Sequence, residues 1–253
     1  MAAIVMRATS HNAWLYRPQP MDRPAFRLFC LPHSGGSSAL FHRWHEALPP
    51  AVELLAVQLP GRGIRFRETP YRNISPLLEA LLVALRPQLD VPFAFFGHSL
   101  GALLAFELAH ALRSDDLQPG VLFISACHAP QLLPTGEMLH SMPREELLVA
   151  LRRINGTPAE VLAEEELLDL ILPTLRADMA VYETYAYLPR APLPYPIIAC
   201  GGREDSRVTP PQLEAWREQA AGRFELHLFA GDHFYLNGVR PQLMQIIGRE
   251  LAP

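Results

Sequence analysis

A serine flanked by glycines is the strongest chemical signal in the sequence. Ser99 lies in the segment Gly97–Gly101, which reads G-x-S-x-G, directly after the apolar run Phe93–Gly97 and before a segment of helical periodicity. A tight turn between a strand and a helix requires glycine at its flanks and exposes the serine hydroxyl. The start of the helix also offers N–H groups to a developing negative charge. We therefore predict that Ser99 is a nucleophile.

A serine nucleophile needs a base, and on such a turn the partners follow along the chain as a carboxylate and then a histidine. His233 follows the apolar run Phe224–Phe229 in a glycine-containing loop, and we predict that it is the base. The apolar run Ile197–Gly201 leads into Glu204 and Asp205. Either carboxylate could orient the imidazole; we prefer Asp205 as the acid and keep Glu204 as the alternative.

The oxyanion formed by attack on a carbonyl needs backbone donors. One is the N–H after the nucleophile, which belongs to Leu100, and the second comes from a loop after an early strand. The loop at 32–36 contains paired glycines that let backbone donors approach a substrate oxygen. We predict that Leu100 and Ser34 supply the two N–H groups, with Gly35 as the alternative to Ser34.

Histidines near this loop raise the alternative of a metal site. His33, His42 and His45 lie close together in the sequence, but no motif supplies carboxylate or cysteine ligands to complete a site. We therefore predict no metal. The cysteines have no metal-binding spacing and are predicted to be buried free thiols; they are Cys30, Cys127 and Cys200.

Six short apolar runs, most of them separated by helical patterns, must position these side chains. Strands that are apolar throughout and alternate with helices indicate an α/β protein with a mostly parallel central sheet flanked by helices. Such sheets bind ligands at the carboxyl ends of their strands. The predicted strands are Phe26–Leu31, Leu54–Leu59, Phe93–Gly97, Val121–Ala126, Ile197–Gly201 and Phe224–Phe229, and the predicted helices include Ser75–Leu85, Leu100–Arg113 and Thr209–Trp216.

The interval 129–192 breaks the alternation of strands and helices. It contains amphipathic helical patterns, including Glu146–Ile154 and Glu164–Leu175, and no convincing strand. We predict a helical lid inserted within one domain that spans residues 1–253. An apolar stripe on the lid could cover the substrate or could only pack the lid against the core. Its side chains are Leu167, Ile171, Leu175, Met179 and Tyr182.

Composition excludes several classes of function. The chain has 253 residues, of which 49% are hydrophobic and 19% charged, as in a folded globular protein. With a net charge of −4 and no block of Lys and Arg, nucleic acid is not expected as a partner. No apolar run approaches the roughly 20 residues that span a bilayer. The start of the chain lacks a signal-peptide pattern, so we expect a cytoplasmic protein with an irregular arm over residues 1–25.

Motifs along nearly the whole chain resemble the type II thioesterases that accompany polyketide synthases and nonribosomal peptide synthetases. The chain departs from their pattern at Ser34, where such proteins usually carry alanine, and at Arg203-Glu204, where acidic residues are common. The matching segments are Leu31–Gly36, Gln58–Arg62, Phe96–Gly101, Arg152–Thr157, Leu172–Asp178, Glu183–Tyr185 and Gly231–Leu236.

The resemblance implies an α/β-hydrolase fold and an editing activity. Enzymes of this family hydrolyse stalled or incorrect acyl groups from the phosphopantetheine arm of acyl or peptidyl carrier proteins. No cofactor is then expected, because the carrier brings the thioester, and we expect a monomer. The residues predicted to contact the substrate are His33, Gly35, Phe234, Met179 and Tyr182.

Two alternatives remain at this point. A general carboxylester hydrolase would use the same three side chains on free esters. A hydrolase-like protein could also bind synthase components without catalysis.

Overall fold

A single seven-stranded sheet forms the centre of the molecule in the computed structural model, which describes residues 12–115, 117–133 and 136–252. The strand order is β1-β3-β2-β4-β5-β6-β7, and all neighbouring strands are parallel except β1 and β3. The strands are β1 (Leu15–Tyr16), β2 (Phe26–Leu31), β3 (Val52–Val57), β4 (Phe93–His98), β5 (Leu122–Ser125), β6 (Ile197–Gly202) and β7 (Phe224–Phe229).

The apolar runs of the sequence became strands because both faces of the sheet are covered. Every residue of β3, β4, β5 and β6 is buried, whereas the edge strand β7 is only half-buried. This confirms the predicted α/β architecture with a mostly parallel sheet. The third strand begins at Val52 and not at Leu54, because the chain already pairs there with Phe26 of β2.

The prediction of an irregular arm over residues 1–25 was wrong for one short segment. β1 pairs antiparallel with β3 and places Leu15 opposite Val57. A two-residue strand carries too little periodicity to be recognised in a proline-rich sequence. Residues 1–11 lie outside the described part of the chain.

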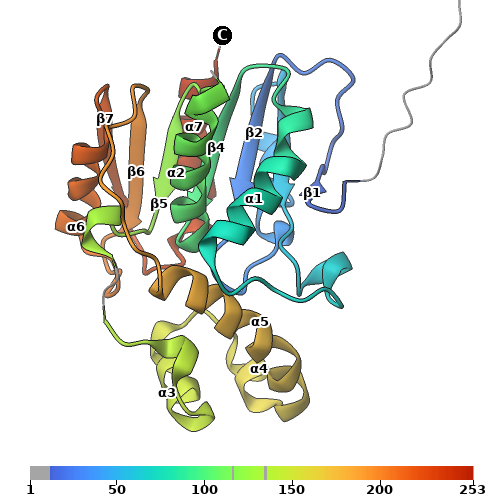
Figure 1. Ribbon diagram of the computed structural model, residues 1–253, viewed down its shortest axis with the longest axis vertical. Helices are drawn as coiled ribbons and strands as arrows, with labels where there is room; N and C mark the ends of the chain where they lie inside the picture. Colours follow the sequence, from blue (N-terminus) through green and yellow to red (C-terminus); the bar gives the residue numbers. More distant parts are fainter. Residues whose placement is uncertain (1–11, 116, 134–135, 253) are drawn as a thin grey trace, which may run out of the picture.

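Helices cover the sheet on both sides (Figure 1). α1 (Ile74–Leu85) and α2 (Leu100–Leu112) contribute to the apolar core on one face, and α7 (Arg240–Leu251) contributes to the core on the other. α7 was not predicted from the sequence, although its proline in the first turn and its apolar spacing are helical signals. α6 (Pro210–Glu214) follows β6 and begins with a capping box at Thr209.

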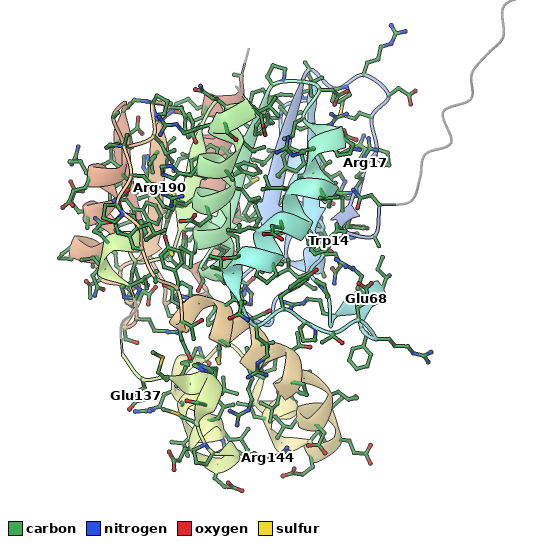
Figure 2. The ribbon with its side chains drawn as sticks, in the orientation of Figure 1. Trp14, Arg17, Glu68, Glu137, Arg144 and Arg190 are labelled. Atoms are coloured by element: carbon green, nitrogen blue, oxygen red, sulfur yellow. The ribbon has the colours of Figure 1, made fainter. Side chains whose placement is uncertain are left out.

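The described residues between β5 and β6 include three α-helices, which lie at one end of the sheet (Figure 1). They are α3 (Arg144–Ile154), α4 (Ala159–Ala163) and α5 (Glu165–Glu183). Arg144 at the start of α3 forms ion pairs of 2.6 Å with Glu165 and Asp169 of α5, at the end of the lid far from the sheet (Figure 2). These helices enclose their own apolar cluster, which is separate from the two clusters against the sheet.

The apolar stripe of the lid is shifted by one residue at its start. Leu167 was predicted to face inward, but its side chain is exposed and Leu168 is buried in its place. Leu175 is buried as predicted, and α5 continues past Pro173 to Glu183. Met179 and Tyr182 therefore lie on the same helix as Leu175, in its C-terminal half. Figure 1 shows that this half of α5 is the one nearest the sheet.

Candidate active site

The turn that carries Ser99 is strained and depends on its two glycines. Ser99 has φ 55° and ψ −118°, and its N–H donates to the carbonyl of Ser125 at 2.8 Å. A Cβ atom on Gly97 would lie 2.2 Å from the carbonyl oxygen of Gly101, and one on Gly101 would lie 2.1 Å from that of Leu31. Neither position therefore tolerates a side chain. The two glycines let β2, β4 and α2 approach each other closely, and this packing holds Ser99 at the end of β4.

A hydrogen bond joins Asp205 and His233, which follow the neighbouring strands β6 and β7. His233 Nδ1 lies 2.8 Å from Asp205 Oδ2, and both side chains are buried. Asp205 Oδ1 accepts the N–H groups of Arg207 at 2.8 Å and Val208 at 3.1 Å. Burial opposes ionisation of Asp205, but His233 and the two N–H donors outweigh it, and the pKa of the carboxyl is lowered. An ionised Asp205 can only accept, so Nδ1 of His233 carries the proton.

The alternative carboxylate, Glu204, has a different partner. Its side chain is exposed and accepts the N–H of Gly231, so it holds the loop after β7 against the loop after β6. The geometry therefore selects Asp205 as the partner of His233. The two loops come together because Gly202 and Phe229 are opposite each other at the ends of β6 and β7.

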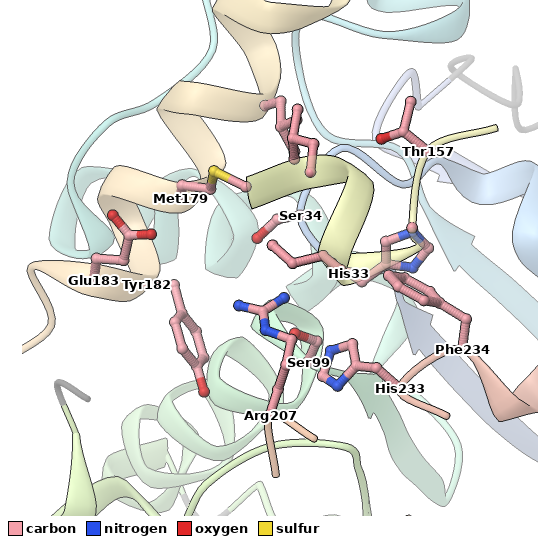
Figure 3. Close-up of a pocket in the computed structure, with 14 residues that line it drawn as sticks. His33, Ser34, Ser99, Thr157, Met179, Tyr182, Glu183, Arg207, His233 and Phe234 are labelled. Carbon is pink, nitrogen blue, oxygen red and sulfur yellow. The ribbon is translucent and has the colours of Figure 1, made fainter. Parts of the chain in front are cut away.

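The second imidazole nitrogen of His233 is available to Ser99. Nε2 of His233 is buried and has no hydrogen-bond partner among the described residues. Ser99 and His233 line the same two hollows, and Figure 3 shows their side chains next to each other. Since Nδ1 is engaged by Asp205, the opposite nitrogen is directed away from Asp205, on the side of the ring where Ser99 lies.

The loop after β2 is held by a buried ion pair that sequence reasoning missed. Gly35, with φ 75°, donates its N–H to Asp178 Oδ2 at 2.7 Å. Asp178 on α5 forms two further bonds with Arg62, at 2.6 and 2.7 Å, and Arg62 also donates to the carbonyl of Gly36 at 3.0 Å. Both charged side chains are buried. Gly35 was the alternative oxyanion donor, but its N–H is occupied, whereas Ser34 lines the hollow beside Ser99.

Leu100 is placed as the sequence predicted for an oxyanion donor. It is the first residue of α2, so its N–H has no acceptor within the helix. Ser34 lies in the loop after β2 and lines the hollow that contains Ser99, whereas Leu100 directly follows Ser99 at the start of α2. The signals for Asp178 and Arg62 were present in the sequence as parts of the matching motifs, but nothing in local spacing indicated that they pair.

Two hollows meet at Ser99 and His233. The first extends toward the loop after β2, residues 32–36, which we call the oxyanion loop, and is closed by the lid. Its lining includes residues predicted to contact substrate, namely His33, Phe234, Met179 and Tyr182, as Figure 3 shows. Gly35, also predicted there, lines an adjoining hollow with Ser34 and Leu175 instead. The second hollow at Ser99 runs the other way, past Tyr182 and Glu183 to Arg153, Arg207 and Gln212.

Comparisons with known proteins agree on one protein family. The thioesterase domain family model matches residues 26–251. The gramicidin S biosynthesis protein GrsT of Aneurinibacillus migulanus is 38% identical over 95% of this chain and 94% of its own length. The thioesterase PikA5 of Streptomyces venezuelae is 40% identical over 88% of this chain and 80% of its own. This chain belongs to the thioesterase family.

A solved structure shares the whole architecture. The type II thioesterase BorB from the borrelidin biosynthetic cluster superposes with a TM-score of 0.87 at 41% identity, covering 94% of this chain and 98% of BorB. The fold is therefore that of the α/β-hydrolases, as the sequence predicted.

Aromatic rings surround the imidazole of His233 in this thioesterase. The ring centroids of His98 and Phe234 lie 5.5 and 5.2 Å from that of His233, and the centroid of His33 lies 5.2 Å from that of Phe234. Burial and the charges of His233 and Arg62 lower the pKa of His33 to about 4, and burial also lowers the pKa of His98. At neutral pH both are uncharged neighbours of His233. His98 is bonded to Ser125 through Nδ1 at 2.8 Å, as expected for a packing residue of the turn.

The thioesterase shows no clustered metal ligands in the part of the chain that the structure describes. His42 bonds to the hydroxyl of Tyr16 at 2.9 Å, and His45 bonds to the carbonyl of His42 at 2.9 Å. The cysteines Cys30, Cys127 and Cys200 are buried and free, as predicted. Within the described residues, no helix has the length and apolar character needed to cross a membrane.

Proposed function

We propose that this thioesterase hydrolyses acyl groups from the phosphopantetheine arm of carrier proteins in polyketide or nonribosomal peptide biosynthesis, with Ser99, His233 and Asp205 as its catalytic triad. One observation carries the proposal. The buried 2.8 Å bond from His233 to Asp205 leaves the other nitrogen of His233 unpartnered among the described residues, in the hollow that contains Ser99.

The first step is acyl transfer to the enzyme. His233 Nε2 takes the hydroxyl proton as Ser99 Oγ attacks the thioester carbonyl, and the N–H groups of Leu100 and Ser34 bind the oxyanion. The ionised Asp205 stabilises the imidazolium. The carbon–sulfur bond then breaks, and the carrier thiol leaves with the proton from His233.

The second step releases the acyl group. His233 takes a proton from water, the hydroxide adds to the acyl-enzyme carbonyl, and Ser99 leaves with the proton returned by His233. One water is consumed for each carboxylic acid and free carrier thiol formed. The protein needs no cofactor of its own in this scheme, because the thioester arrives on the partner.

The names of two relatives support a role in such biosynthesis, in which acyl groups are carried on phosphopantetheine arms. GrsT is named for gramicidin S biosynthesis and BorB comes from a borrelidin biosynthetic cluster. Two hollows that meet at Ser99 give separate routes for the acyl group and for the pantetheine arm. We further propose that the protein acts as a monomer in the cytoplasm, since one chain supplies every residue of the triad and the cysteines are free.

A general carboxylester hydrolase is the competing function, and substrate comparison separates the two. One acyl group is presented on a carrier protein, on free pantetheine and as an ethyl ester, and kcat/KM is measured for each. We expect the carrier thioester to be preferred at least tenfold over both small substrates. A preference for the ethyl ester would overturn the proposal.

A further inference from the structure

Arg207 is an arginine that the proposed mechanism does not use. It lies two residues after Asp205, and its N–H donates to Asp205 Oδ1 at 2.8 Å, so its backbone is fixed by the triad acid. Its side chain lines both hollows that meet at Ser99 and extends between Tyr182 and His233 (Figure 3). A guanidinium is permanently charged, so a positive charge stands beside the reacting serine.

The acidic side chains of these hollows are already engaged. Glu183 Oε2 accepts the backbone N–H of His140 at 3.0 Å and lies 2.6 Å from its Nδ1. Glu137 forms an ion pair with Arg153 at 3.7 Å. By contrast, the guanidinium of Arg207 has no hydrogen-bond or ion-pair partner among the residues described.

Two of the groups that line the second hollow with Arg207 are neutral at neutral pH. The Tyr182 hydroxyl and His128 Nδ1 are 3.2 Å apart. Burial lowers the pKa of His128, and the charge of Arg207 lowers it further. Burial raises the pKa of Tyr182. A guanidinium that pairs with no carboxylate of the described residues can bind an anion that enters the hollow with the substrate.

Hydrolysis of a neutral acyl group does not call for this charge. The oxyanion is bound by the N–H groups of Leu100 and Ser34, and the imidazolium is stabilised by Asp205. The positive charge of Arg207 is therefore better explained by recognition of the substrate. The phosphate of the carrier arm is the other anion of the complex, but it lies at the opposite end of the arm from the thioester.

We propose that Arg207 binds a carboxylate carried by the acyl group, so that half-thioesters of dicarboxylic acids are preferred substrates. This inference rests on the proposed thioesterase function and names a substrate class for it. The planar guanidinium fits a carboxylate with two parallel hydrogen bonds. Short dicarboxylic groups such as malonyl place that carboxylate close to the carbonyl that Ser99 attacks.

An isosteric pair of substrates tests the inference. Malonyl and 3-methylbutanoyl groups have the same branched shape, but only malonyl is charged. Both are loaded on one carrier protein, and the ratio of their kcat/KM values is measured for the wild type, Arg207→Gln, Arg207→Lys and Arg203→Gln. Arg203 is an exposed arginine of the same loop and serves as the matched control.

We expect the wild type to prefer malonyl and Arg207→Gln to lower the ratio about 10- to 100-fold, the value of a charge-assisted hydrogen bond. Arg207→Lys should retain part of the preference, and Arg203→Gln all of it. Labelling of Ser99 by a fluorophosphonate shows whether each variant keeps an intact site.

If the wild type hydrolyses either carrier substrate and Arg207→Gln leaves the ratio unchanged, the inference is overturned but the proposed function stands. A parallel loss for both substrates would instead assign Arg207 to the oxyanion or to the phosphate. If the wild type hydrolyses no acyl carrier at all, the proposed function itself fails.

Discussion

The site is assembled from two regions that are built differently. Ser99, Asp205 and His233 each follow a strand of the parallel sheet, and backbone hydrogen bonds fix Ser99 and Asp205. The lid contributes through side chains of α5, of which Asp178 holds the oxyanion loop and Met179 faces the hollow. The sheet edge therefore determines the chemistry, while the lid adjusts the oxyanion loop and the space for substrate. Changes at the sheet edge should abolish turnover, and changes in the lid should reduce it partially.

The sharpest contrast within the sheet region is between the two neighbouring carboxylates. We expect Asp205→Asn to lower kcat about 10⁴-fold, as loss of the carboxylate does in related triads, because the imidazole loses its tautomer and its counter-charge. Glu204→Gln should change kcat by less than about threefold. Steady-state hydrolysis of an acyl carrier measures both. Equal losses in the two variants would contradict the assignment of Asp205.

On the lid side, Asp178→Ala removes the acceptor of Gly35 and leaves Arg62 buried without its counterion. We expect kcat to fall about 10- to 100-fold with a smaller change in KM, because the oxyanion loop loses its anchor. The free energy of unfolding should fall by about 3–5 kcal/mol, measured by urea denaturation. Asp169→Asn, an exposed carboxylate of the same helix, is the control.

A double variant separates these two effects. Arg62→Met with Asp178→Leu replaces the buried pair by apolar side chains of similar volume, which should restore much of the stability. The acceptor for Gly35 is still missing, so kcat should stay low. Recovery of the wild-type kcat would show that the contact with the oxyanion loop is unimportant.

The same division explains what the sequence could predict. Ser99 and His233 were recognisable because a strand, a turn and a required residue type lie together within a few positions. Asp178 and Arg62 are 116 positions apart and meet only when the lid is folded, so no local pattern indicates their ion pair. β1 was missed because its two residues lie in a proline-rich segment. Leu167 was misplaced because the helical spacing of the apolar residues allows either Leu167 or Leu168 to face inward.

A smaller effect is expected where the lid only shapes the hollow. Met179→Trp adds volume to the wall facing Ser99, and we expect it to reduce kcat/KM about tenfold for octanoyl carriers relative to acetyl carriers. Competition between the two carriers, followed by mass spectrometry, gives the ratio directly. An unchanged ratio would indicate that the stripe only packs the lid against the core.

A separate effect concerns the pH dependence of stability. The pKa of His33 is lowered to about 4 by burial and by the charges of His233 and Arg62. Between pH 6.5 and 4 the unfolded chain therefore binds a proton that the folded chain does not, and the free energy of unfolding falls as the pH falls. His33→Phe should reduce this slope by up to about 1.4 kcal/mol per pH unit. Urea unfolding at several pH values measures it, and parallel curves would contradict the buried neutral state.

The most direct test of the account is to trap the acyl-enzyme. The protein is mixed with an acyl carrier, quenched in acid within the first turnover and digested, and the peptide that contains Ser99 is weighed. We predict that this peptide gains the mass of the acyl group in the wild type, and that Ser99→Ala neither gains it nor hydrolyses the carrier. Acylation at another residue, or undiminished hydrolysis by Ser99→Ala, would contradict the central claim.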